Sequence, residues 1–76
     1  MSVEDFVEKF TFAIESEPGS IQANTEYKSL KNWDSLNALS LIAMADADYN
    51  VALAGNDIQS STTVADLWKI VQERMG

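Results

Sequence analysis

Apolar residues recur at intervals of three and four near the start of the chain. This spacing places one apolar stripe along a helix, so it predicts an amphipathic helix over roughly residues 2–15. Ser2 is the expected N-cap, and Glu4 and Asp5 lie in the first turn, where negative charge is favourable. The residues of the stripe are Val3, Phe6, Val7, Phe10, Ala13 and Ile14.

The next stretch, residues 16–33, has no helical periodicity. It contains the turn-forming run Pro18-Gly19-Ser20, and its apolar residues Ile21, Tyr27 and Leu30 stand alone. We therefore predict a long loop with one helical turn. A loop of this length inside a compact domain is usually functional or wraps around the core.

The following segment is predicted to form a helix from Ser35 to about Asn50. This helix is apolar over much of its circumference. Such a helix either lies in the middle of a bundle or presents apolar surface to a partner. Because a chain of 76 residues leaves little room for complete burial, we expect Leu36 and Leu39 to be exposed. One face carries Leu36, Leu39, Ala43 and Ala47, and the other carries Ala38, Leu41, Ile42, Ala45 and Tyr49.

Two more helices are predicted in the last third of the chain. A connection that ends at Gly55-Asn56 leads into a short helix over residues 56–60, with Ile58 pointing inward. Thr62 or Thr63 is the expected N-cap of the last helix. Its apolar stripe consists of Val64, Leu67, Trp68, Val71 and Met75.

Both ends of this last helix carry favourable residues. The run Thr63-Val64-Ala65-Asp66 resembles a capping box with aspartate in the usual place of glutamate. Arg74, in the last turn, is expected to interact favourably with the helix dipole. No segment shows the alternation of a half-buried strand. We therefore expect a single all-α domain over residues 1–76: a small four-helix bundle with three main helices, one short helix, and a long loop between helices one and two.

Composition and charge restrict the partners of this domain. A hydrophobic content of 46% indicates a folded core rather than a disordered tail. Twelve acidic residues against five basic ones give a net charge of −7, which repels nucleic acid and anionic membranes and attracts basic patches on other proteins. We expect no nucleic-acid binding, no membrane insertion and a monomeric protein.

The N-terminal residues and the absence of cysteine indicate the cellular setting. The first residues lack the basic region and the apolar core of a signal peptide, and no apolar run approaches the ~20 residues that span a bilayer. The absence of cysteine fits a reducing compartment. We expect a cytoplasmic location, and the Met1 start favours a free-standing protein.

Asp34 and Ser35 are the strongest candidates for a functional site. Both are good N-cap residues, but only one residue can occupy that position. If Asp34 is the cap, Ser35 becomes the first helical residue, with its hydroxyl in solvent beside unpaired N–H groups and the positive end of the helix dipole. Such a site suits a covalently attached phosphate. The simpler alternative is that the two residues serve only to begin the helix.

Catalysis and metal binding by this chain are not expected. A nucleophilic serine needs a base, and the chain has no histidine and no suitably placed lysine. Asp46 and Asp48 are two residues apart, so they diverge on a helix, and no histidine or cysteine can join them in a metal site. Only a weak surface site for a divalent cation remains open. We therefore expect the chain not to be an enzyme.

The run Asp34-Ser35-Leu36 lies at the start of the second of four helices in a short acidic chain. In this position it resembles the acyl carrier protein family. The Pro/Gly-containing loop after helix one, the short helix near Asp57-Ile58 and the segment Thr63-Val64-Ala65-Asp66-Leu67 also resemble that family. The resemblance covers essentially the whole chain.

The resemblance implies a covalent cofactor. In the family, a phosphopantetheinyl transferase attaches 4′-phosphopantetheine from coenzyme A to the serine of Asp-Ser-Leu, which is Ser35 here. The thiol of that arm then carries an acyl group as a thioester among partner enzymes, so the absence of cysteine is no objection. Asp34 and Leu36 would be recognised by the transferase.

The resemblance also implies how partners are recognised. Leu36, Leu39, Asp46 and Asp48 lie where the family's recognition helix presents apolar and acidic side chains. The expected partners are acyl-loading, synthase or transferase enzymes with basic docking patches.

Several residues depart from the pattern of carriers in fatty-acid synthesis. Trp33 and Asn37 replace the usual flanking residues, and Ser40 and Ala47 stand where acidic residues are common. These departures point toward polyketide or other specialised lipid biosynthesis. Trp33 either packs the loop against the bundle or has a functional role.

Two other functions stay open. The first is an unmodified protein–protein interaction module that uses the apolar face of helix two. The second is an aminoacyl or peptidyl carrier domain, for which the common Gly-Gly-x-Ser pattern is missing.

Overall fold

The computed structural model describes residues 2–31 and 33–75; residues 1, 32 and 76, and with them both ends of the predicted domain, lie outside the described residues. Within the described ranges the secondary structure is entirely helical, which confirms the predicted fold class. The elements are α1 (Val3–Ala13), the 3-10 turn η1 (Tyr27–Ser29), α2 (Ser35–Tyr49), α3 (Gly55–Ser60) and α4 (Val64–Met75).

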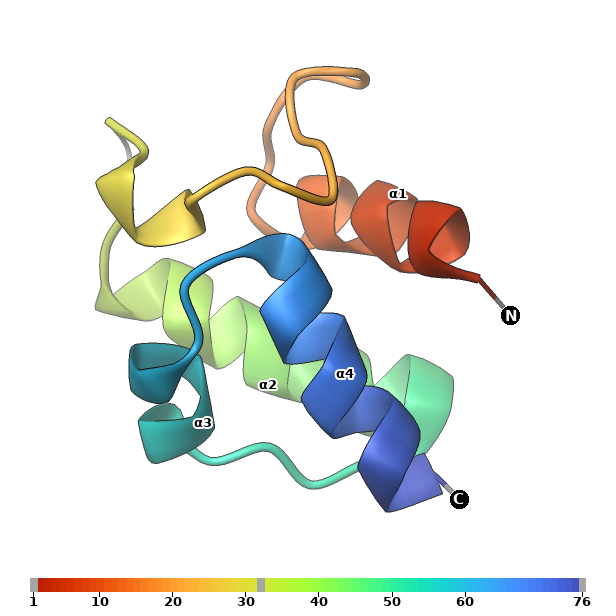
Figure 1. The fold of residues 1–76 in the computed structure, drawn as a ribbon. Coiled ribbons are helices and arrows are strands. Elements are labelled where there is room, and N and C mark those ends of the chain that lie inside the picture. The colour runs from red at the N-terminus through yellow and green to blue at the C-terminus, as the bar shows by residue number, and fades with distance from the viewer. Residues whose placement is uncertain (1, 32, 76) are drawn as a thin grey trace.

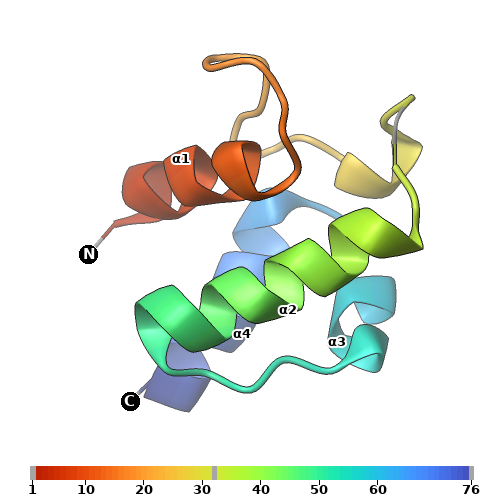
Figure 2. The ribbon, with the colours of Figure 1, turned by 180° about the vertical axis from the view of Figure 1, so that it is seen from behind.

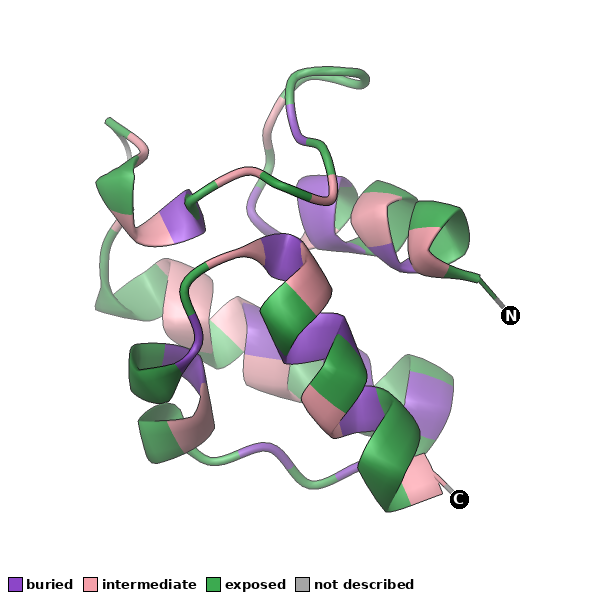
Figure 3. Cartoon of the chain, viewed as in Figure 1, coloured by how far each residue is buried: buried purple, intermediate pink, exposed green. Residues whose placement is uncertain are grey.

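The three long helices enclose one apolar core. Helix α1 packs against α2 and α4, and the short helix α3 packs against α2 and α4 at the other side of the bundle (Figures 1 and 2). The buried residues of each helix lie on the side that faces its neighbours (Figure 3). Among the described helices, none combines the length and the apolarity needed to cross a bilayer.

Aromatic rings join the three long helices at the centre of the core. Phe6 of α1 is fully buried, and its ring centroid lies 5.1 Å from that of Trp68 in α4 and 5.8 Å from that of Tyr49 in α2. Phe10, one turn further along α1, lies 6.1 Å from Phe6. Such ring contacts add to the free energy that burial alone provides. The predicted stripe of α1 is thus the side that enters the core.

The loop between α1 and α2 is anchored by the Tyr27 side chain. The Tyr27 ring is fully buried and lies 5.4 Å from Phe10. Its hydroxyl donates to the Ile58 carbonyl oxygen at 2.6 Å, and the Ser61 carbonyl oxygen is 3.3 Å away. Burial raises the pKa of Tyr27 to about 12, so this hydroxyl keeps its proton and continues to donate at neutral pH.

The same loop also covers the start of α4. The Ala23 carbonyl oxygen accepts the Ala65 N–H at 2.8 Å, and the Thr25 carbonyl oxygen accepts the Val64 N–H at 3.2 Å. These N–H groups belong to the first turn of α4, where no acceptor is available within the helix. The loop therefore wraps around the core, as its length predicts, and it satisfies backbone groups of a helix about 40 residues away.

The predicted caps of α1 and α4 are confirmed. The Ser2 hydroxyl accepts the Asp5 N–H at 3.3 Å. At the start of α4 the Thr63 hydroxyl accepts the Asp66 N–H at 3.2 Å, and the Asp66 carboxylate accepts the Thr63 N–H at 3.1 Å. This reciprocal pair is a capping box. Helix α2 ends at Tyr49, and its C-cap Asn50 has a φ of 55°, the left-handed conformation that asparagine tolerates better than most residues.

Arg74 has a tertiary role that its position in α4 did not predict. Its guanidinium forms a bidentate ion pair with Asp57, with N–O distances of 2.6 and 2.8 Å, and also donates to the Ala52 carbonyl oxygen. The Asp57 carboxylate in turn accepts the Ala54 N–H at 2.8 Å, at the start of α3. Arg74 therefore links the end of α4 to the beginning of α3, in addition to its favourable place in the helix dipole.

The Asp57–Arg74 pair makes a pH-dependent contribution to stability. The Arg74 hydrogen bonds, and then the Ala54 N–H, hold the pKa of the Asp57 carboxyl below its ordinary value of 3.8. Because the pKa of Asp57 is lower in the folded state, its ionised carboxylate stabilises the fold at pH values above the ordinary, unfolded-state pKa. This stabilisation disappears as the pH falls through the folded-state pKa. We expect Asp57→Asn to reduce the free energy of unfolding at pH 7 and to have no effect at the lowest pH values, as measured by urea unfolding across a pH series.

The matched control is Asp46→Asn, which removes the same charge from a carboxylate without a side-chain hydrogen bond or ion pair among the described residues. An equal effect in this control, or an Asp57→Asn effect that persists unchanged in acid, would contradict the assignment.

Candidate functional site

The structure resolves which residue begins α2. Asp34 has an extended backbone conformation, and its Oδ1 atom accepts the Asn37 N–H at 3.0 Å. The Asp34 carbonyl oxygen accepts the Ala38 N–H at 3.3 Å. These are the two bonds that define an N-cap residue. Asp34 is therefore the cap, and Ser35 is the first residue of the helix.

The Ser35 side chain is exposed, and among the described residues none forms a hydrogen bond with its hydroxyl. The N–H groups of Ser35 and Leu36 belong to the first turn, so they have no acceptor within the helix. An anion attached to the Ser35 hydroxyl would meet these donors and the positive end of the helix dipole. The position thus fits a phosphate ester.

Ser35 does not have the surroundings of a catalytic nucleophile. The whole chain has no histidine, and no side-chain base contacts the Ser35 hydroxyl among the described residues. No group of three or more acidic side chains in residues 2–31 and 33–75 is arranged to hold a metal ion. The hydroxyl can therefore receive a group from another catalyst, but nothing in its surroundings activates it for catalysis.

Two exposed leucines follow the serine on α2. Leu36 is 70% exposed and Leu39 is 60% exposed, which confirms their predicted exposure. Asp46 follows Leu39 after seven residues, or about two helical turns, so the two lie on the same face. Together with Ser35, these residues form an apolar and acidic surface that begins at the N-terminal end of the helix.

Asp48 lies apart from this surface. It is two residues from Asp46, which places the two side chains roughly 160° apart around the helix axis. Asp48 instead lines a groove between α1 and α2. The structure thus brings Leu36, Leu39 and Asp46 together with Ser35, but it separates Asp48 from them.

Trp33 packs the loop against the bundle. Its half-buried ring meets the Tyr27 ring edge to face, with centroids 5.1 Å apart, and contacts the core. It therefore extends the series of aromatic contacts to the residue immediately before the N-cap. Of the two interpretations of Trp33, the structure supports packing.

Sequence reasoning missed one surface feature, the groove between α1 and α2. Phe12 lies beside it and is 86% exposed. The sequence did contain a signal, because Phe12 is the one aromatic residue of this helix that falls outside the apolar stripe. None of the residues that line the groove is Ser35, Leu36 or Leu39.

The division of roles between Asp34 and Ser35 has a direct consequence for stability. Since Asp34 provides the cap, Asp34→Ala should lower the free energy of unfolding by about 1 kcal/mol. Ser35→Ala, which removes an exposed and unbonded hydroxyl, should change it by less than ~0.5 kcal/mol. Urea or thermal unfolding of both variants measures this. A loss of ~1 kcal/mol or more in Ser35→Ala would show that the serine is structural.

Comparison with known proteins supports the fold. No protein-family model matches this chain, and no significant relative was found among curated protein sequences. Among solved structures, the chain is similar to the solution NMR structure of the holo acyl carrier protein from Geobacter metallireducens, with a TM-score of 0.76. The alignment covers 96% of this chain and 84% of that chain at 20% sequence identity. The chain therefore has the fold of an acyl carrier protein, as the resemblance of its sequence predicted.

Proposed function

We propose that this protein is an acyl carrier that is modified on Ser35. The observation that carries the proposal is an exposed serine hydroxyl, without a hydrogen-bond partner in the described part of the chain, directly after an aspartate N-cap at the start of the second helix of this fold. The structural neighbour is described as a holo acyl carrier protein. For this chain we infer the same kind of prosthetic group, 4′-phosphopantetheine.

The residues around Ser35 suit attachment of this group. The Ser35 Oγ atom forms an ester bond to the phosphorus of coenzyme A that bears the pantetheine arm, while the bond from that phosphorus to the 3′,5′-ADP leaving group breaks. The hydroxyl proton passes to a base of the phosphopantetheinyl transferase, because this chain offers none. The helix dipole and the N–H groups of Ser35 and Leu36 then stabilise the phosphodiester by roughly 0.3–1 kcal/mol. When bound, the arm supplies a thiol that carries an acyl group as a thioester.

Asp34 keeps the attachment site in place. Its carboxylate is bonded to the Asn37 N–H, so it holds the first turn of α2 whether or not Ser35 carries a group. The transferase would therefore meet an ordered helix start with Asp34 and Leu36 on either side of its target. The exposure of both residues is compatible with direct recognition.

Partner enzymes would recognise the surface that begins at Ser35. Leu36 and Leu39 offer apolar area to a pocket, and Asp46 on the same face offers a charge to a basic patch. The net charge of −7 raises the rate of encounter with basic partners without requiring tight binding. Such transient docking suits a carrier that visits several enzymes of fatty-acid, polyketide or other specialised lipid biosynthesis.

The exposure of Leu36 and Leu39 also favours a second candidate, an interaction module without a prosthetic group. An exposed apolar pair at the end of a helix is typical of a docking surface. In that case Ser35 would serve only as the first residue of α2. The two candidates differ in one chemical event, the modification of Ser35.

The test is to incubate the purified chain with coenzyme A and a broad-specificity phosphopantetheinyl transferase and then to measure the intact mass. We expect a gain of one phosphopantetheine group, and no gain in Ser35→Ala. Ser40→Ala removes another serine of α2 and should leave the gain unchanged. No gain with several transferases would favour the interaction module, and a gain that persists in Ser35→Ala would reject Ser35 as the site.

A further inference from the structure

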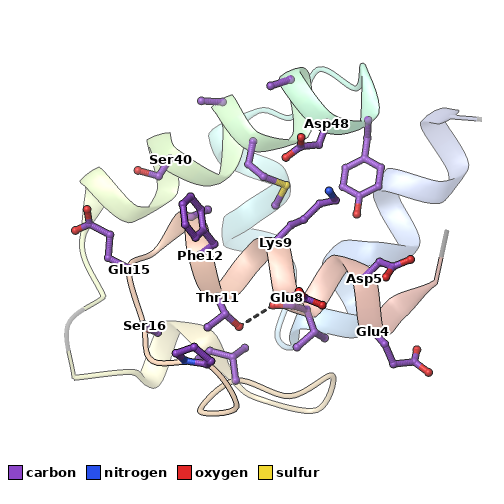
Figure 4. Close-up of a pocket in the computed structure, with 18 of the residues that line it drawn as sticks. Glu4, Asp5, Glu8, Lys9, Thr11, Phe12, Glu15, Ser16, Ser40 and Asp48 are labelled. Carbon is purple, nitrogen blue, oxygen red and sulfur yellow. Dashed lines mark hydrogen bonds between the residues drawn. The ribbon is translucent and has the colours of Figure 1, made fainter.

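A long groove runs between α1 and α2, on the side of the bundle that Asp48 faces (Figure 4). Its volume of about 1770 Å³ exceeds the ~300–1,000 Å³ of ordinary small-molecule pockets, and it is open to solvent. Residues from the start to the end of α1 and residues from Ser40 to Tyr49 of α2 line it. Four residues of the loop after α1 (Ser16, Pro18, Gly19 and Ile21) also line this space, so the volume is that of the whole hollow around α1. The groove therefore has the size and openness of a site for a protein segment.

The apolar part of the groove is centred on Phe12. Phe12 projects from α1 toward α2 (Figure 4) and is 86% exposed, more than either Leu36 or Leu39. Ala43, Met44 and Ala47 of α2 line the opposite wall. Phe12 is thus a large aromatic side chain in contact with solvent, and its neighbours are small and apolar. It provides apolar surface area that a partner can bury.

The rim of the groove is acidic. Five carboxylates line it, three from α1, one from the second residue after its end and one from α2, against the single ammonium group of Lys9, which gives a local charge of −4. Among the described residues Lys9 forms no ion pair, so the carboxylates remain largely uncompensated. Their field favours a cationic partner. The five are Glu4, Asp5, Glu8, Glu15 and Asp48.

A buried polar group lies at the end of the same groove. Tyr49 is only 7% exposed, and its hydroxyl has no hydrogen-bond partner among the described residues. Burial, and then the charges of Asp48 and Asp5, raise the pKa of Tyr49, so the hydroxyl stays protonated beside two carboxylates. A buried hydroxyl without a partner costs free energy. A guanidinium that reached this end could donate to the Tyr49 oxygen and to both carboxylates.

We propose that this groove is a second docking surface, and that its occupant is an amphipathic helix of a partner protein, with apolar residues against Phe12 and arginine or lysine residues against the acidic rim. Neither Leu36 nor Leu39 is among the residues that line this groove, and the proposal is independent of the modification of Ser35.

The shape and charge of the groove select this occupant. A furrow between two packed helices accepts a third helix, and α1, with 11 residues, offers a length of about three turns. A second copy of this chain would bring one acidic rim against another, and the charge likewise opposes nucleic acid and anionic lipid.

The probe for the test is a synthetic helical peptide of about four turns, with leucine on one face and arginine on the other. Binding to the unmodified chain is measured by fluorescence anisotropy, and the site is mapped by amide chemical shifts in NMR spectra. We expect the shifts to cluster on α1 and on residues 43–49 of α2. Phe12→Ser should weaken binding by about tenfold or more. The double change Asp5→Asn with Asp48→Asn should weaken binding and reduce its dependence on salt.

Leu39→Ser is the matched variant, because it removes a similarly exposed apolar side chain that lies about 180° around α2 from Asp48. We expect it to change the affinity less than about twofold. Since Phe12 is exposed, Phe12→Ser should keep the circular dichroism spectrum of the wild type, and Phe12→Leu should retain most of the binding. We expect the peptide to bind Ser35→Ala as tightly as the wild type. Failure of the carrier proposal can therefore be distinguished from failure of this one.

Three outcomes would overturn the proposal. The first is a loss of binding in Leu39→Ser that equals the loss in Phe12→Ser. The second is equal binding of a control peptide in which glutamate replaces arginine. The third is a dimer, detected by sedimentation, that Phe12→Ser abolishes, since the occupant would then be a second copy of the chain.

Discussion

The buried side chain of Tyr27 determines where the functional end of α2 lies. Its ring packs between Phe10 of α1 and Trp33, and its hydroxyl is bonded to the Ile58 carbonyl oxygen. One residue thus joins the long loop to the first helix, to the short third helix and to the residue just before the N-cap. Because Asp34 follows Trp33 directly, these contacts fix the point at which the chain enters α2. Ser35 is presented to solvent by a loop that is itself held in the core.

The features that the sequence predicted well depend on residues close together in the chain. The alternation of buried and exposed positions in α1 follows from helical geometry alone, and Phe6 and Phe10 lie on the expected side. The caps of Ser2 and of Thr63 with Asp66 involve residues three apart, so their types and spacing suffice to identify them. The exposure of Leu36 and Leu39 could be predicted from chain length alone, because a chain of this size cannot bury every apolar side chain.

The features that the sequence did not reveal depend on contacts between distant residues. Arg74 and Asp57 are 17 residues apart, and Tyr27 and Ile58 are 31 apart. Periodicity shows which side of a helix is apolar, but not which neighbour packs against it. The spacing of two residues already separates Asp48 from Asp46 around the helix, but the sequence did not show that α1 lies beside Asp48. Phe12 was visible as an exception to the stripe, but its neighbours in α2 were not.

The two sites proposed on α2 occupy different lengths of the helix. Ser35 begins the helix and Tyr49 ends it, and its 15 residues extend for about 22 Å. A protein seated along residues 40–49 would leave Ser35 itself unobstructed. Cargo carried on Ser35, as proposed above, would then explore only a small volume around a complex that has already formed, so its transfer would depend on a local effective concentration instead of on repeated bulk encounters. Such tethering would allow consecutive reactions to proceed without dissociation.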